Sequence, residues 1–275
     1  MSQASPVVFI TGCSNGGIGS ALAVEFAQRG CLVYASARSV TAMSDLPESI
    51  RKLQLDVTND TACEKAVQTI IEEAGHIDIF ISNAGVANVG PLLDITVETA
   101  QKVMDTNLFG TVRLVRLIGP HMVKRKKGLI IPVGSTAGEL SIPFMGYYNP
   151  SKAALHAYTE TLALELKPFG VHVMLCSPGS VKSNIADVSV SNLPEGSFYS
   201  ANEDKMTRVL FYGQNRSPMP TNKFAKVVVD KALTSSPPTY MTAGGTTTLW
   251  SFLKWLPRPF ALKMIWNATV GELKV

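Results

Sequence analysis

Short runs of apolar residues alternate along the chain with longer stretches in which apolar residues recur every three or four positions. The short runs are nearly continuous in apolar residues, which is typical of strands buried on both faces of a parallel sheet. The pattern predicts seven strands: Val7–Thr11, Leu32–Ser36, Lys52–Leu55, Ile77–Ser82, Leu129–Val133, Val171–Ser177 and Thr239–Thr242.

The longer stretches predict helices. Ile18, Leu22 and Phe26, for example, follow a spacing of four residues, which places them on one helical face. Strand and helix therefore alternate from the N-terminus onward, and this order predicts an α/β fold. We expect a Rossmann-type, doubly wound parallel sheet of seven strands with helices on both faces.

We expect the 275 residues to form one domain, 1–275, with three parts. Residues 1–183 carry the regular alternation. Residues 184–220 mix Ser, Asn, Pro and Gly with four aromatic residues, which is typical of a lid or mobile loop; a plain surface loop is the alternative. Residues 221–275 are expected to supply the last helix, the last strand and an apolar C-terminal tail.

Composition narrows the class of protein. Hydrophobic residues make up 46% of the chain and charged residues 17%, which excludes a disordered chain. The net charge of +4 is mild and indicates no nucleic-acid partner. Four scattered cysteines and four unpaired histidines predict intracellular thiols and no metal. The first residues lack the features of a signal peptide, so we expect a cytoplasmic protein.

A glycine-rich turn follows the first expected strand. It reads Thr-Gly-Cys-Ser-Asn-Gly-Gly-Ile-Gly over residues 11–19 and leads into a helix. Glycines let the backbone approach a pyrophosphate closely, and the free N–H groups of a helix N-terminus attract its negative charge. The turn predicts a dinucleotide site with these contacts: Gly12, Ser14, Asn15, Gly17, Ile18 and Gly19.

The second expected strand indicates which dinucleotide binds. A site for NAD places an Asp or Glu here to bind the ribose 2′-hydroxyl, but this strand runs into Ala37 and Arg38 without an acid. A guanidinium binds a 2′-phosphate bidentately, whereas a carboxylate repels it. Arg38 therefore predicts NADP(H) as the cofactor; the alternative is that Arg38 is a solvated loop cation.

Tyr148 and Lys152 form a YxxxK motif, which places both side chains on one face of a helix. A tyrosine has a pKa of about 10, and a nearby ammonium favours its phenolate. We expect Lys152, together with a cationic nicotinamide, to lower the pKa of Tyr148. Ser135 lies 13 residues before Tyr148, directly after the fifth expected strand.

These motifs and their order resemble the short-chain dehydrogenase/reductase (SDR) family. The family's usual turn is TGxxxGxG; the turn here is one residue longer, which leaves open whether Gly16 or Gly17 lies closest to the phosphate. The variant TGCSxGGIG is similar to that of the fungal NADPH-dependent 1-acyldihydroxyacetone-phosphate reductases. The resemblance covers the chain to about residue 183.

The resemblance implies further cofactor contacts at the strand ends. By it, Asp56 bonds the adenine amino group, and the Val181 N–H meets the nicotinamide carboxamide. The full set of additional contacts is Asp56, Val57, Asn83, Ala84, Gly85, Pro178, Gly179, Val181 and Ser183.

The resemblance also assigns the chemistry. Ser135 bonds the substrate carbonyl oxygen, Tyr148 acts as general acid, and Lys152 holds the ribose hydroxyls. Asn107 holds a water that relays protons to the lysine. Asn107, Tyr148 and Lys152 are thus expected at both the catalytic and the cofactor site.

These residues predict an NADPH-dependent carbonyl reductase of a small-molecule ketone. The apolar lid and tail favour a lipid-like or polycyclic ketone, as in the acyldihydroxyacetone-phosphate reductases. Ketoreductases of fungal secondary metabolism and hydroxysteroid or retinol dehydrogenases are alternatives. A non-catalytic NADP(H)-sensing module is an alternative of another class; such modules typically lose the tyrosine or the lysine.

Residues 249–266 form an aromatic tail that holds all three tryptophans, with Lys254, Arg258 and Lys263 among them. These charges and two prolines exclude an uninterrupted spanning helix. The tail can cover the substrate cleft, form a subunit contact in a homo-oligomer, or lie in a membrane interface. The last alternative would place the protein peripherally on the endoplasmic reticulum or on a lipid droplet.

Overall fold

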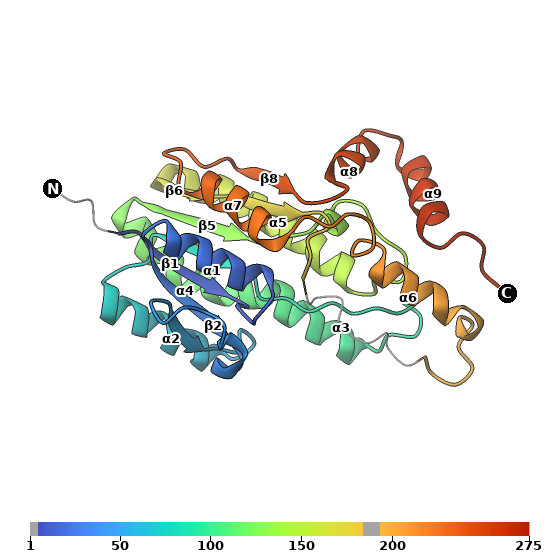
Figure 1. Cartoon of the computed structure of the whole chain (residues 1–275), viewed down its shortest axis with the longest axis horizontal. Coiled ribbons are helices and arrows are strands. Elements are labelled where there is room, and N and C mark those ends of the chain that lie inside the picture. The colour runs from blue at the N-terminus through green and yellow to red at the C-terminus, as the bar shows by residue number, and fades with distance from the viewer. Residues whose placement is uncertain (1–4, 184–192, 275) are drawn as a thin grey trace.

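Figure 1 shows a computed structural model of the chain, which describes residues 5–183 and 193–274. Six parallel strands form the main sheet in the order β3-β2-β1-β4-β5-β6. Their bounds are β1 Val7–Thr11, β2 Leu32–Ala37, β3 Arg51–Gln54, β4 Ile79–Ser82, β5 Gly128–Pro132 and β6 Val171–Val173. The order reverses between β1 and β4, which confirms the predicted doubly wound parallel sheet.

One predicted strand, Val171–Ser177, is divided in two. β7 (Leu175–Pro178) begins after Met174 and pairs in parallel with β8 (Tyr240–Ala243) in a second sheet of two strands. The Met174 N–H donates to the Ile130 carbonyl at 2.9 Å, so the chain stays beside β5 through the break. All seven predicted strands are therefore present, with this one shared between the two sheets.

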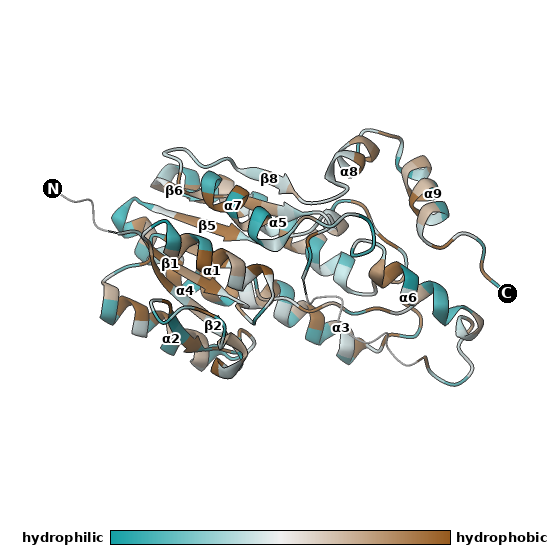
Figure 2. Cartoon of the chain, in the orientation of Figure 1, coloured by the Kyte–Doolittle hydropathy of each residue, from teal (hydrophilic) through white to brown (hydrophobic). Residues whose placement is uncertain are grey.

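Helices cover both faces of the main sheet, as predicted (Figure 1). Successive residues of β1 point to opposite faces: Val8 and Ile10 belong to one core cluster and Phe9 to the other. The helices of the first face are α1 (Ile18–Gln28) and α7 (Thr221–Ala232), and those of the second are α2 (Asp60–Ala74), α4 (Gly110–Arg125) and α5 (Tyr148–Leu166). The central strands β1 and β5 are mainly hydrophobic, whereas the helices combine hydrophobic and hydrophilic positions (Figure 2).

Shorter elements complete the domain. α3 (Val97–Met104) runs into a π-helical turn, Asp105–Phe109, and from there into α4. Single 3-10 turns are found at Val40–Met43, Thr136–Gly138, Lys167–Phe169 and Ser200–Asn202. Among the residues that the structure describes, no group of acidic, histidine and cysteine side chains could hold a metal ion.

The stretch predicted to be irregular contains a helix. Residues 184–192 lie outside the described residues, but further along the stretch α6 (Glu203–Phe211) forms. α6 buries Met206 and Val209 on one side. The irregular prediction was wrong for α6, because the Gly- and Pro-containing segments on either side obscured this short apolar spacing.

The aromatic tail folds into two helices, α8 (Thr247–Leu253) and α9 (Arg258–Thr269), at the C-terminal end of the molecule (Figure 1). A small apolar cluster fixes them to the domain: Leu140, Trp250, Leu253, Ala261 and Ile265. Within residues 5–183 and 193–274, no helix is both long and apolar enough to cross a membrane.

Candidate active site

A cavity of about 450 Å³ lies at the carboxyl ends of the parallel strands, the edge at which doubly wound sheets bind ligands. It is lined by most of the residues predicted from the sequence: Gly12, Ser14, Asn15, Gly17, Ile18, Arg38, Asn83, Gly85, Ser135, Tyr148, Lys152, Pro178, Gly179, Val181 and Ser183. The predicted residues that do not line it are Gly19, Asp56, Val57, Ala84 and Asn107.

Close backbone contacts shape the glycine-rich turn. Gly12 has a φ of +71°, and a Cβ at this position would lie 2.7 Å from the Ala84 Cα. A Cβ at Gly19 would lie 2.4 Å from the Gly12 carbonyl oxygen. Gly19 therefore serves the site by allowing the turn to close, although it does not line the cavity.

The N-terminus of α1 is open toward the cavity. Gly17 precedes the helix, no side chain caps its first N–H groups, and its first turn holds no acid. Gly17 and Ile18 both line the cavity. Free N–H groups and the positive end of the helix dipole fit the pyrophosphate of a dinucleotide.

Thr11 and Asn83 join the ends of β1 and β4 under this turn. The Thr11 Oγ1 accepts hydrogen bonds from the backbone N–H groups of Asn83 and Ala84, each at 3.1 Å. The Asn83 Nδ2 donates to the carbonyls of Thr11 and Gly12, each at 2.9 Å. Thr11 is a supporting residue that the sequence analysis missed. The signal available in the sequence was a hydroxyl residue at the end of an expected strand.

Arg38 follows β2, is exposed and lines the cavity. No acidic side chain is among the described residues that line it. Asp56, also exposed, lies beside the cavity: hydrogen bonds from Thr58 hold the pKa of this carboxyl below its usual value, and Arg38 lowers it further. Val57 is buried against Gly110, so its side chain contributes packing.

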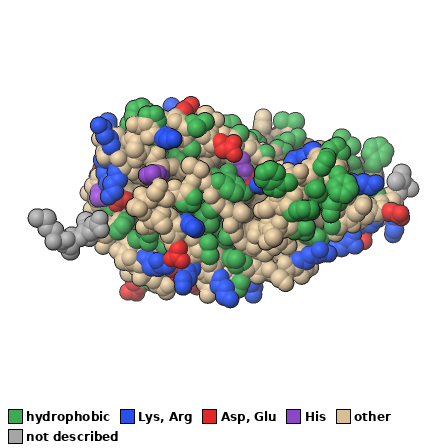
Figure 3. Space-filling model, turned by 90° about the horizontal axis from the view of Figure 1, so that it is seen from above, with side chains coloured by type: hydrophobic (Ala, Val, Ile, Leu, Met, Phe, Trp, Pro, Cys, Tyr) green, Lys and Arg blue, Asp and Glu red, His purple; other side chains and the backbone are tan. Residues whose placement is uncertain are grey.

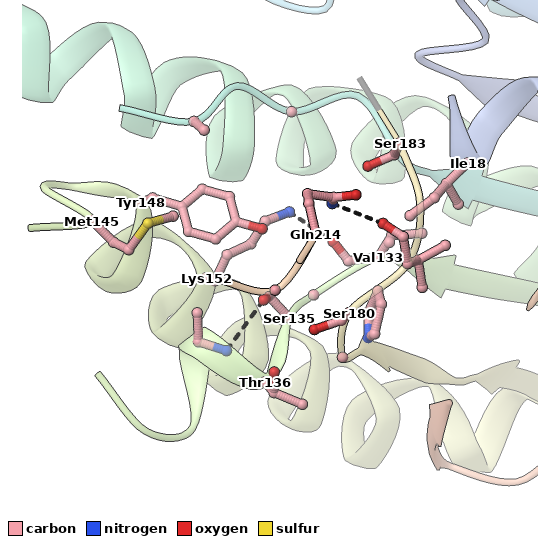
Figure 4. A pocket seen from close by; sticks show the side chains of 18 of the residues that line it. Ile18, Val133, Ser135, Thr136, Met145, Tyr148, Lys152, Ser180, Ser183 and Gln214 are labelled. Carbon is pink, nitrogen blue, oxygen red and sulfur yellow. Dashed lines mark hydrogen bonds between the residues drawn. The ribbon is translucent and has the colours of Figure 1, made fainter. Parts of the chain in front are cut away.

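Tyr148 and Lys152 project from the first turns of α5 into the cavity, beside Ser135 (Figure 4). The Lys152 Nζ lies 5.7 Å from the centre of the Tyr148 ring and donates a hydrogen bond to the Val133 carbonyl at 2.8 Å. The Ser135 Oγ accepts from the Ala137 N–H at 3.1 Å. The structure therefore brings together three of the four side chains predicted to carry the chemistry.

Burial governs the protonation of this group. It raises the pKa of Tyr148, against a smaller lowering by the hydrogen bond with Ser135, and it lowers the pKa of Lys152 to about 8. The expectation that Lys152 and a cationic nicotinamide together lower the pKa of Tyr148 stays a prediction; in the chain alone, burial raises that pKa, and the Lys152 ammonium binds the Val133 carbonyl. Tyr148 is thus held as the protonated phenol, the form that a general acid needs.

Asn107 stands behind the cavity in the π-helical turn and is buried. Its Oδ1 accepts from the Val86 N–H at 2.8 Å, and its Nδ2 donates to the Val86 carbonyl and to the Ser151 Oγ, each at 2.9 Å. Such π-turns occur frequently at functional sites. The side chain of Asn107 fixes the loop after β4 to α5; its water-holding role stays a prediction.

Two further polar residues of α5 support the site and were missed in the sequence. The Ser151 Oγ donates to the Tyr148 carbonyl at 2.8 Å. The His156 Nε2 accepts from the Ser135 N–H at 3.2 Å, and burial lowers the pKa of His156 to about 4, so the ring stays neutral and can accept. The spacing of four residues between Lys152 and His156 was the available signal, since it places both on one helical face.

The loop after β7 forms the next wall of the cavity. Val181 pairs with Met219, and the Gln214 Nε2 donates to the Val181 carbonyl at 3.0 Å (Figure 4). A Cβ at Gly179 would lie 2.6 Å from the Gly245 carbonyl oxygen. These contacts fix the backbone of the residues predicted to meet a nicotinamide.

The cavity lining also includes a group of apolar and aromatic residues. They are Ile142, Met145, Val209, Leu210, Tyr212 and Trp250, and Gln214, Thr246 and Thr269 line the cavity with them. Of the four aromatic residues between 184 and 220, only Tyr212 lines it; Phe198 is exposed, and Tyr199 packs edge-on against Phe144. The predicted lid therefore contributes the second half of α6 and one ring, and its closure stays a prediction.

Known proteins match this chain along most of its length. The family model for short chain dehydrogenases matches residues 6–193. The NADPH-dependent 1-acyldihydroxyacetone phosphate reductase of Schizosaccharomyces pombe is 38% identical over 72% of this chain and 69% of its own. The short-chain dehydrogenase virD of Hypocrea virens is 33% identical over 97% of this chain and 92% of its own.

A solved structure of a short-chain dehydrogenase also matches the fold of this chain. A short-chain dehydrogenase from Streptomyces avermitilis superposes with a TM-score of 0.79 at 25% identity, over 96% of this chain and 94% of its own. Sequence and fold therefore point to the same group of proteins.

Proposed function

The chain belongs to the short-chain dehydrogenase family, and we propose that it reduces the ketone of a neutral, lipid-like or polycyclic substrate with NADPH. The observation that carries this proposal is the arrangement of Ser135, Tyr148 and Lys152 between the phosphate-binding turn and an apolar cavity. An NADP(H)-sensing module would have no use for a buried, protonated tyrosine beside a serine.

Each of the three side chains has its own role in the proposed reduction. NADPH, when bound, supplies the hydride. The Tyr148 hydroxyl gives its proton to the oxygen of the substrate as that oxygen becomes an alkoxide, and the Ser135 hydroxyl donates a hydrogen bond to the same oxygen. In this proposal Lys152 holds the nicotinamide ribose, and the hydrogen bond with the Val133 carbonyl orients its ammonium.

Arg38 supports the choice of NADPH over NADH. We expect wild-type protein to bind NADPH at least about tenfold more tightly, which corresponds to about 1.4 kcal/mol. Arg38→Asp should reverse the preference, because a carboxylate repels the 2′-phosphate and accepts from a 2′-hydroxyl. Ala37, the other candidate position for an acid, is buried in the core and is unsuitable.

Fluorescence titration of both cofactors measures this preference. Arg38→Gln is the control: it should weaken NADPH binding without any gain for NADH. Equal dissociation constants for the two cofactors in the wild type would contradict the assignment of Arg38.

The charges of the cavity support a neutral substrate. Arg38 and Lys152 are the only cations among the described residues that line it, and residues 184–192 contain no Lys or Arg in their sequence. In this proposal Arg38 binds the 2′-phosphate of NADPH, and Lys152 binds the nicotinamide ribose. A phosphate on the substrate would then lack a cationic partner inside the cavity.

A second candidate is 1-acyldihydroxyacetone phosphate, the substrate named for the Schizosaccharomyces pombe relative. One observation favours it. The Arg216 guanidinium lies 4.4 Å from the centre of the Tyr212 ring, and Tyr212 lines the cavity. Arg216 therefore places a cation beside the cavity lining, within the predicted lid of residues 184–220.

A matched pair of substrates separates the two candidates. We expect kcat/KM, measured by NADPH oxidation, to be at least about tenfold higher for a 1-acyldihydroxyacetone than for its phosphate, since the phosphate must be desolvated without a partner. Steroid, retinal and polyketide ketones complete the panel. Preference for the phosphate, lost in Arg216→Gln, would instead establish the second candidate.

A further inference from the structure

α8, α9 and the turn between them, which holds Trp255, carry a group of large apolar side chains that are exposed to solvent. Trp255 is 88% exposed, Phe252 59% and Phe260 55%. With Leu249, Leu262 and Met264, these residues are called the α8–α9 face below. Figure 3 shows hydrophobic side chains gathered at this end of the molecule, with basic side chains next to them.

The α8–α9 face is distinct from the side chains that hold the two helices in place. Trp250 and Leu253 of α8, and Ala261 and Ile265 of α9, turn inward and pack on Leu140. The exposed rings are not part of this buried cluster. Large exposed apolar side chains gathered at one end of a molecule indicate an interaction site.

Within residues 247–271 the charged side chains are all basic, while Glu139, which pairs with Lys254, and the exposed Glu272 lie next to this stretch. Residues 247–271 contain Lys254, Arg258 and Lys263 and no Asp or Glu. Lys254 forms an ion pair with Glu139, and Arg258 donates to the Glu139 carbonyl at 2.7 Å, so both are anchored to the domain. Lys263 is exposed on α9, beside the apolar side chains.

We propose that the α8–α9 face docks on the surface of an anionic lipid membrane or monolayer. Exposed Trp, Phe and Leu with Lys and Arg at their side form the composition of interfacial helices, whose rings enter the headgroup region while the cations meet lipid phosphates. The absence of acids in residues 247–271 complements a negative surface. The protein lies on the lipid and does not cross it.

The same charges argue against a second copy of the chain as the occupant. A symmetric contact brings the same patch of both subunits together, so Lys263 and Arg258 would face their own copies. Residues 247–271 hold no acid that could compensate them. A lipid surface supplies the negative charge that the patch itself lacks.

Docking through this face would bring the lipid close to the cavity. Trp250 of α8 and Thr269 of α9 both line the cavity, on the sides of the helices opposite to the exposed rings. An apolar ligand leaving the lipid would then meet the two helices that also form part of its binding site. The docking itself does not depend on the identity of that ligand.

Flotation of the purified full chain with vesicles tests the proposal. We expect binding to phosphatidylcholine vesicles that contain phosphatidylserine, and binding at least about tenfold weaker for Trp255→Ser and for the Phe252→Ser, Phe260→Ser double variant. Lys263→Glu should weaken binding to these vesicles but not to phosphatidylcholine alone. Phe169→Ser is the matched control, because Phe169 is 49% exposed on another part of the surface and should leave binding unchanged.

Three results would overturn the proposal. The first is wild-type protein that stays in the soluble fraction with both kinds of vesicle, and the second is variants of the face that bind as well as the wild type. The third is sedimentation showing a dimer that Trp255→Ser dissociates, which would assign the face to a second copy. NADPH binding by each variant verifies that it is folded, since none of the substituted residues lines the cavity.

Discussion

Replacing Tyr148 with phenylalanine is expected to remove turnover while leaving NADPH binding nearly intact. Burial raises the pKa of the Tyr148 phenol and keeps it protonated beside Ser135, and phenylalanine retains its shape without the proton. Loss of a general acid costs about 10²- to 10⁴-fold in rate. We therefore expect kcat to fall by at least about 100-fold, measured with the best ketone of the substrate panel.

The neighbouring residue supplies a matched control. Tyr147 precedes α5 and does not line the cavity, so Tyr147→Phe makes the same chemical change one position away and should keep full activity. Titration with NADPH shows whether each variant still forms the cofactor site. If Tyr148→Phe keeps more than a few per cent of the wild-type kcat, another group is the acid.

The protonation of Tyr148 illustrates a limit of sequence reasoning. The YxxxK spacing predicts proximity, and the structure confirms it, with the Lys152 Nζ 5.7 Å from the ring centre. The spacing contains no information on burial, which raises the pKa of the phenol and outweighs the hydrogen bond with Ser135. Whether a charge or desolvation wins depends on atoms that come from other strands, such as the Val133 carbonyl.

The strand-end motifs were predictable because each depends on local sequence. A glycine-rich turn, the arginine after β2 and the loop after β7 all follow apolar runs, and parallel strands bring their carboxyl ends to one edge. The supporting contacts were not predictable, because Thr11, Ser151 and His156 form hydrogen bonds with residues of other elements. The helical spacing inside α6 was short enough to be hidden by its flanks.

Arg38 and Ala37 show the same difference between what local sequence predicts and what depends on packing. That an arginine follows the strand is a sequence fact, and its place in the cavity follows from the strand order. That Ala37 is buried depends on the helices packed against β2, so only the structure reveals that an acid is better introduced at position 38.

Replacing Lys152 with methionine is expected to damage both cofactor binding and turnover. Methionine fills a similar volume, so the buried site keeps its packing, but the ammonium that donates to the Val133 carbonyl and is placed to hold the ribose is lost. We expect kcat to fall by at least about 100-fold, and NADPH to bind at least about tenfold more weakly. Steady-state kinetics and fluorescence titration measure the two effects separately.

The pH dependence of NADPH binding distinguishes a loss of charge at Lys152 from a general disturbance. Burial lowers the pKa of Lys152 to about 8, so its ammonium is present below that pH and is lost as the pH rises through it. Wild-type affinity for NADPH should therefore weaken above about pH 8, and Lys152→Met should lack this change. Lys182→Met, at an exposed lysine that does not line the cavity, should retain both the affinity and its pH dependence. An identical pH profile in Lys152→Met and the wild type would show that another group titrates, and that Lys152 does not hold the ribose as a cation.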